Sequence, residues 1–135
     1  MTTQLTLPDP TKAREYFQAK MQFTTGPVEL DHVISDKANV NIVDVRYADD
    51  YAKGHVPGAI NLPKDKWQTF QGLSKDRANV VYCYTQTCHL AAEACFLFAS
   101  NGFPVMEMEG GFAAWKAADL RIEKPTLTQR LRKAA

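Results

Sequence analysis

Two cysteines, Cys83 and Cys88, flank a short polar loop where a run of β-branched residues ends and an apolar helical pattern begins. This order puts the Cys83 sulfur at the carboxyl end of a strand, in front of the amino end of a helix. Backbone N–H groups and the helix dipole at such a point favour negative charge. We therefore expect Cys83 to ionise more easily than a free cysteine, whose pKa is about 8.5. The sequence predicts thiolate chemistry at this residue.

The elements that must position these thiols alternate between strands and helices along the chain. The patterns predict strands over residues 40–45, 60–62, 79–83 and 104–108, and helices over residues 11–22, 28–35, 49–53, 63–70, 88–100 and 112–118. Such alternation is typical of an α/β fold whose parallel sheet has helices on both faces. Sites in these sheets form at the carboxyl ends of strands. Cys83 lies at one such end, and Asp44 and Arg46 lie at another.

Composition excludes several classes of function. The chain has 135 residues, of which 45% are hydrophobic and 23% charged, and a formal net charge of +1. This balance argues against a nucleic-acid or membrane-surface partner. The first residues do not read as a signal peptide, and no apolar run approaches the roughly 18 residues that span a bilayer. Three sparse cysteines indicate reactive thiols in a reducing compartment, so we expect a cytoplasmic protein.

Four segments together resemble a single-domain rhodanese, a sulfurtransferase, of the subgroup with a Cys-x4-Cys loop. They are IVDVR at 42–46, YAKGHVPGAINLP at 51–63, VVYC at 80–83 and MEMEGGFAAW at 106–115. The resemblance implies a rhodanese-like three-layer fold with a central parallel sheet of about five strands. It divides the chain into an N-terminal helical extension (1–26), the rhodanese-like domain (27–120) and a basic C-terminal tail (121–135), which we expect to be solvated.

The resemblance also assigns a mechanism to Cys83. In this family the matching cysteine attacks a sulfane sulfur, becomes a persulfide, and passes the sulfur to a thiol or to cyanide. The expected partners are a small-molecule sulfur donor and a thiol or protein acceptor, without a cofactor, and the oligomeric state stays open. Backbone N–H groups of residues 84–89 are expected to cradle the anion as a nest does.

The loop itself departs from the usual family pattern. Its expected substrate-binding residues are Tyr84, Thr85, Gln86, Thr87, Cys88 and His89. They lack the Gly and the Arg or Lys that are usual there. A charge-assisted contact is typically worth about 1.5–3 kcal/mol, so we expect weak activity with the thiosulfate dianion and better activity with a persulfide or polysulfide. The missing Arg also argues against a phosphatase, because the phosphate oxygens need its planar fork.

Several roles stay open on sequence alone. Cys88 is either a resolving thiol or a helix residue whose sulfur points elsewhere, while Cys95 reads as core. His89 is a candidate substrate contact, and we expect it to be mainly neutral because a helix N-terminus disfavours its charged form. Asp44 and Arg46 are expected to support the site by tying loops together, with Arg46 alternatively lending charge to its mouth.

Two further alternatives concern the function of the thiol pair. A metal site built on Cys83, Cys88 and His89 is disfavoured, because the sequence offers no second pair of ligands at suitable spacing. The alternative to sulfur transfer is a thiol redox or sulfide-sensing or binding module that uses Cys83 and Cys88 without true thiosulfate turnover.

Overall fold

The computed structural model describes residues 5–126, and its centre is a five-stranded sheet in the order β1-β5-β4-β2-β3 with every pair parallel. The strands are β1 (Thr24–Thr25), β2 (Val40–Asp44), β3 (Ile60–Asn61), β4 (Ala78–Tyr82) and β5 (Val105–Met108). The helices are α1 (Pro10–Phe23), α2 (Pro27–Ser35), α3 (Ala48–Lys53), the 3-10 helix η1 (Lys64–Thr69), α4 (Leu90–Ser100) and α5 (Gly111–Ala117). The predicted α/β fold with five parallel strands is confirmed.

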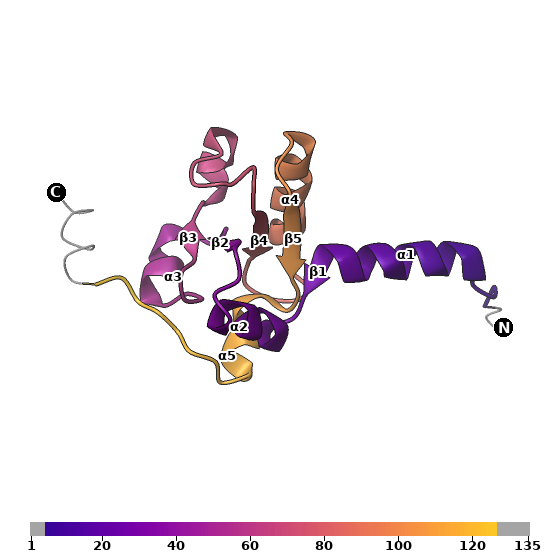
Figure 1. Ribbon diagram of the computed structural model, residues 1–135, viewed down its shortest axis with the longest axis horizontal. Helices are drawn as coiled ribbons and strands as arrows, with labels where there is room; N and C mark the ends of the chain where they lie inside the picture. Colours follow the sequence, from indigo (N-terminus) through magenta and orange to yellow (C-terminus); the bar gives the residue numbers. More distant parts are fainter. Residues whose placement is uncertain (1–4, 127–135) are drawn as a thin grey trace.

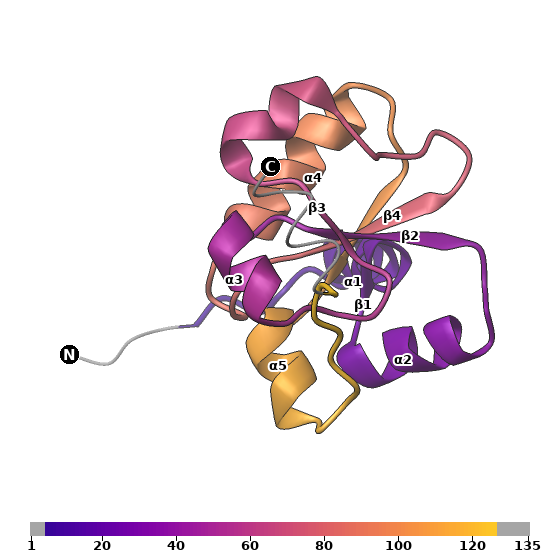
Figure 2. The ribbon, with the colours of Figure 1, turned by 90° about the vertical axis from the view of Figure 1, so that its left-hand side faces the viewer.

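Alternation along the strands creates two apolar cores, one on each face of the sheet. Val43 and Val81 face α4 and η1, whereas Ile42 and Val80 face α2 and α5. Figure 2 shows α2 and α5 on one side of the strands and α4 on the other. Because both faces are covered, the central strands are almost continuously buried, as is typical of parallel sheets.

Most predicted boundaries are shifted by one or two residues, and two differences bear on the site and the sheet. Helix α4 begins at Leu90, because the Cys88 N–H group donates to the Thr85 carbonyl at 3.2 Å and closes a turn before the helix. Strand β1 was not predicted at all. It has only two residues and is defined by its pairing with Glu107 and Met108 of β5. No local sequence pattern predicts this pairing.

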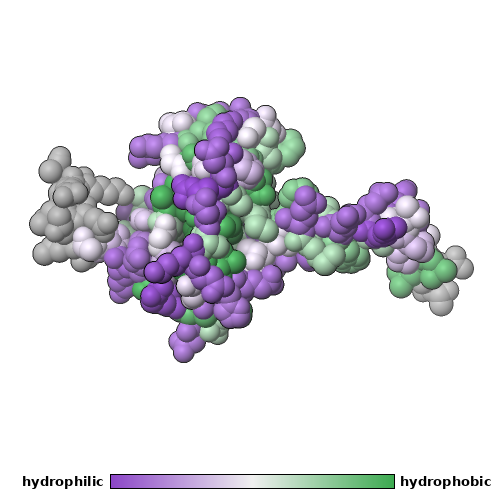
Figure 3. Space-filling model, viewed as in Figure 1, coloured by the Kyte–Doolittle hydropathy of each residue, from purple (hydrophilic) through white to green (hydrophobic). Residues whose placement is uncertain are grey.

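Helix α1 projects from the edge of the sheet (Figure 1). Its first turn is capped by the Asp9 carboxylate, which accepts from the Thr11 N–H group at 2.9 Å. None of its residues is buried, and Figure 3 shows green, apolar surface along part of it. An ion pair of 3.4 Å between Lys20 and Glu109 links its last turn to the domain.

The segment that follows α5 lies against the domain. His55 and Glu123 exchange two backbone hydrogen bonds of 2.9 Å, and the Trp115 indole donates to the Arg121 carbonyl at 2.8 Å. Residues 121–126 of the predicted tail are therefore mostly exposed, as expected, but are hydrogen-bonded to the domain through Arg121 and Glu123, while the rest of that tail, 127–135, lies outside the described residues. Of the helices within residues 5–126, none has the length and apolar character needed to cross a membrane.

Candidate active site

Cys83 follows β4 directly, and the start of α5 fixes its backbone. The Phe112 N–H group donates to the Cys83 carbonyl at 2.8 Å, and the Ala113 N–H group donates to the Tyr84 carbonyl at 3.0 Å. Gly111 makes this approach possible. It has a φ of +64°, and a Cβ there would lie 2.8 Å from the Cys83 oxygen. From the sequence alone, no role was assigned to Gly111, although a Gly pair between a predicted strand and a predicted helix is its visible signal.

The Cys83 sulfur is buried beneath the loop, with the residue only 2% exposed. Its Sγ atom lies 3.5 Å from the Cys88 carbonyl oxygen and 4.0 Å from that of Thr85. Backbone N–H groups of Ala91 and Tyr84 hydrogen-bond to the sulfur and lower its pKa. The expected cradle is therefore present in part, with one donor from the loop and one from the first turn of α4.

The expectation of an easily ionised Cys83 is nevertheless wrong. Burial raises the pKa of the Cys83 thiol to about 11, because loss of hydration penalises the thiolate more than the two N–H donors stabilise it. Hydrogen bonding with the Cys88 side chain, and the negative charge of a Cys88 thiolate, raise that pKa further.

The structure brings Cys88 to Cys83. Cys88 is half-buried, and both residues belong to the apolar cluster formed by β4, α4 and η1. Both thiols are free, as is that of Cys95. Cys95 packs against the same cluster with its sulfur 3.9 Å from the Met106 carbonyl oxygen, and burial raises the pKa of its thiol to about 12. It occupies the core-side position that the sequence predicted.

The remaining loop residues divide into an exposed tip and one anchored residue. Thr85, Gln86 and Thr87 are exposed. Tyr84 is instead tethered to α3, because its hydroxyl donates to Asp50 Oδ2 at 2.6 Å and accepts from the Tyr47 N–H group at 3.0 Å.

His89 is exposed at the N-cap position of α4. It borders a surface hollow of about 430 Å³ together with Ala92, Glu93 and Phe96. Within the described residues, no three His, Cys, Asp or Glu side chains gather in a cluster that could hold a metal ion.

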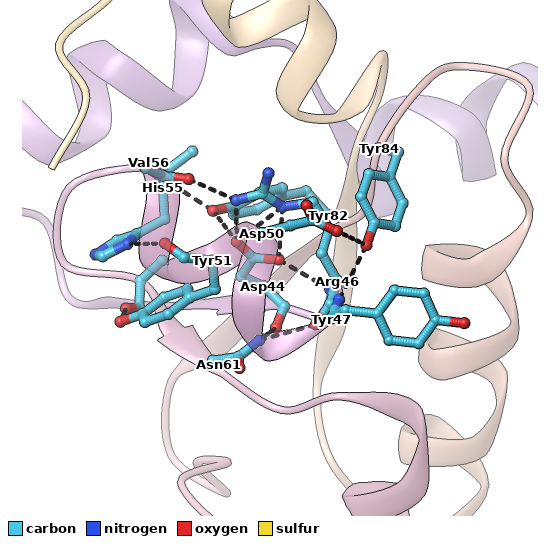
Figure 4. A network of polar contacts seen from close by, with 12 residues as sticks. Asp44, Arg46, Tyr47, Asp50, Tyr51, His55, Val56, Asn61, Tyr82 and Tyr84 are labelled. Carbon is cyan, nitrogen blue, oxygen red and sulfur yellow. Dashed lines mark hydrogen bonds and ion pairs between the residues drawn. The ribbon is translucent and has the colours of Figure 1, made fainter. Parts of the chain in front are cut away.

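Asp44 and Arg46 form a buried pair at the carboxyl end of β2 (Figure 4). The Arg46 guanidinium donates to Asp44 through Nε at 3.0 Å and through Nη2 at 2.8 Å, and Nη2 also donates to the Gly54 carbonyl at 2.7 Å. The Tyr82 hydroxyl adds a 2.7 Å hydrogen bond to Asp44, and the Phe112 ring lies 4.1 Å from the guanidinium. These contacts tie the turn of residues 54–56 and α5 to the strand ends, and they pair the Arg46 charge inside the fold.

Comparison with curated proteins gives relatives of two kinds. The chain is 33% identical over 88 residues to the thiosulfate sulfurtransferase GlpE of Shewanella oneidensis, covering 64% of this chain and 85% of that protein. It is 32% identical over 90 residues to the HTH-type transcriptional regulator Rv0324 of Mycobacterium tuberculosis, covering 66% of this chain but only 40% of the regulator.

Solved structures and a protein-family model also match this chain. The BH2092 protein of Bacillus halodurans superposes with a TM-score of 0.79 at 31% identity, covering 86% of this chain and 87% of that one. A rhodanese-like domain protein of Staphylococcus aureus gives a TM-score of 0.67 at 25% identity, covering 77% and 99%. The Rhodanese-like domain family matches residues 27–118. This range contains four of the five parallel strands, β2 to β5, and the chain belongs to the rhodanese-like domain family.

Proposed function

We propose that this protein is a sulfurtransferase that carries a sulfane sulfur as a persulfide on Cys83. The observation that carries the proposal is the buried Cys83 sulfur, which directly follows β4 and receives backbone N–H donors from Tyr84 and Ala91. The relatives named thiosulfate sulfurtransferase support the same class of reaction.

The chemistry is a two-step exchange. The Cys83 thiolate attacks the outer sulfur of a donor, a new S–S bond forms, and the donor leaves as a thiolate or sulfite with the electron pair of the broken bond. An acceptor thiolate or cyanide then takes the outer sulfur and restores the Cys83 thiolate. A thiolate with a raised pKa is scarce at neutral pH, but its intrinsic nucleophilicity is higher, which offsets part of the loss.

The donor that fits this loop is a persulfide or polysulfide rather than thiosulfate. Residues 84–89 contain no Arg or Lys, and the charge of Arg46 is paired with Asp44. A thiosulfate dianion would therefore lose a charge-assisted contact worth about 1.5–3 kcal/mol. The acceptor is a small thiol or a protein thiol. Three free thiols fit a reducing, cytoplasmic compartment.

The test is a mass measurement in the Cys88→Ser variant, in which the neighbouring thiol cannot consume the persulfide. After incubation with glutathione persulfide, peptide mapping should find one added sulfur atom on Cys83. Cys95→Ser in the same background is the matched control and should load equally. A Cys83 peptide that gains no sulfur overturns the proposal, as does full loading of the Cys83→Ser variant.

A second candidate, a thiol redox or sulfide-sensing module, is favoured by one observation: two free thiols, Cys83 and Cys88, lie in the same apolar cluster. Under that function the protein would cycle between dithiol and disulfide in response to oxidants, and it would not pass sulfur to an added acceptor. Donor turnover measured with cyanide or a thiol acceptor separates the two functions.

A further inference from the structure

We propose that Cys88 attacks the inner sulfur of a Cys83 persulfide, so that the domain also acts as a persulfide reductase that releases hydrosulfide and forms a Cys83–Cys88 disulfide. The inference rests on the proposed function, because it needs the persulfide on Cys83. It adds an activity to the same site and gives the second thiol a chemical role.

The first support is the position of Cys88 relative to the buried sulfur. Cys83 Sγ lies 3.5 Å from the Cys88 carbonyl oxygen, and the Cys88 side chain hydrogen-bonds with the Cys83 thiol. Cys83 is only 2% exposed, so an external acceptor must displace the loop before it reaches the sulfur. The Cys88 thiol, in contrast, is a nucleophile that already lies beside the Cys83 sulfur.

The second support is the way in which the loop is held. Its base is fixed, because the Cys83 and Tyr84 carbonyls accept hydrogen bonds from α5 and the Tyr84 hydroxyl is bound to Asp50. Its tip, residues 85–87, is exposed, with a long hydrogen bond of 3.5 Å between the Thr85 and Thr87 side chains and one of 3.2 Å from the Cys88 N–H group to the Thr85 carbonyl. A small shift of the tip can therefore carry Cys88 toward the disulfide geometry, in which the two Cα atoms are about 4.4–6.8 Å apart, without moving Cys83.

The third support is the choice of leaving group. A thiolate that attacks the outer sulfur of the persulfide would have to expel the Cys83 thiolate, whose pKa burial raises to about 11. A thiolate that attacks the inner sulfur expels hydrosulfide, the conjugate base of a stronger acid. Because the leaving group of lower pKa departs faster, the buried environment of Cys83 favours sulfide release over relay of the sulfur to Cys88.

The step balances without a further reactant. The bond between Cys88 Sγ and Cys83 Sγ forms, the bond from Cys83 Sγ to the sulfane sulfur breaks, and hydrosulfide leaves with the electron pair. The two thiols are oxidised by two electrons, and the sulfane sulfur is reduced to sulfide. A second turnover requires a dithiol reductant, such as dithiothreitol in the assay or a protein dithiol in the cell, to reopen the disulfide.

The experiment follows one anaerobic turnover of the full chain with glutathione persulfide and no reductant. Wild type should release one sulfide per chain and yield a Cys83–Cys88 disulfide in the peptide map, whereas a donor-free sample should show no disulfide. Cys88→Ser should lose this sulfide release and keep the persulfide. Cys95→Ser, which removes the third thiol of the same cluster, should behave as wild type, and dithiothreitol should make sulfide release catalytic.

Two failures are distinguishable. If Cys88→Ser gains no sulfur on Cys83, the proposed function itself fails, and this inference fails with it. If Cys88→Ser gains the sulfur but wild type retains its persulfide, or releases no more sulfide than Cys88→Ser, only the reductase inference is overturned. A disulfide that joins Cys95 to either of the other cysteines would also overturn it.

Discussion

Gly111→Ala should destabilise the domain through a backbone clash directly beside the candidate site. A Cβ at this residue would lie 2.6 Å from the Tyr84 carbonyl carbon and 2.7 Å from the Thr85 nitrogen. These are backbone atoms, so no side-chain rotation relieves the contact. For Gly111→Ala, the left-handed backbone conformation costs about 1–2 kcal/mol. Overpacking costs about 1–3 kcal/mol more, giving a loss of about 2–5 kcal/mol in the free energy of unfolding.

Gly58→Ala is the matched control for this prediction. Gly58 also has a positive φ, +80°, but nothing lies within 4 Å of a Cβ placed there. Its substitution should therefore cost only the conformational part, about 1–2 kcal/mol. Urea unfolding of the two variants measures the difference, and sulfur loading of Cys83 in the Cys88→Ser background should fall for Gly111→Ala alone. Equal destabilisation of both variants would refute the view that α5 clamps the loop through Gly111.

Three further predictions concern pH, the buried ion pair and the donor. Because the pKa of the Cys83 thiol is raised to about 11, the rate of sulfur loading should climb about tenfold per pH unit through neutral and mildly alkaline pH. A rate profile that levels off near the free-cysteine pKa of about 8.5 would contradict the burial argument. Asp44→Asn leaves the Arg46 charge buried without its carboxylate and should lower the free energy of unfolding by about 3–5 kcal/mol. Urea denaturation tests this, and a loss below 1 kcal/mol, the upper limit of the usual surface pair, would count against it. Gln86→Arg adds a cation to the exposed loop tip, and a charge-assisted contact of about 1.5 kcal/mol raises thiosulfate turnover about tenfold. An equal gain with a persulfide donor would show that charge is not the cause.

The sequence was sufficient for the features that local patterns encode. The β-branched runs located β2 and β4, and the cysteine at the end of β4 located the candidate site at the carboxyl edge of the sheet. The neighbouring Asp44 and Arg46 were expected to tie loops together, and their hydrogen bonds to each other and to Gly54 do so.

The features that were missed depend on contacts between distant segments. The pKa of Cys83 follows from how completely the loop and α4 exclude water, which spacing along the chain does not reveal. The role of Gly111 follows from the approach of α5 to a loop 26 to 28 residues earlier in the chain. Strand β1 exists only because β5 pairs with it.

The lengths of the two outer strands have a consequence for association. β1 and β3 have two residues each, whereas the five-residue strands β2 and β4 lie inside the sheet with partners on both sides. A sheet edge presents unpaired N–H and C=O groups that can template growth by another chain, and very short edge strands limit that template. The most β-prone segments of this protein are thus kept away from neighbouring molecules in the folded state, and aggregation through strand pairing should require prior unfolding of the domain.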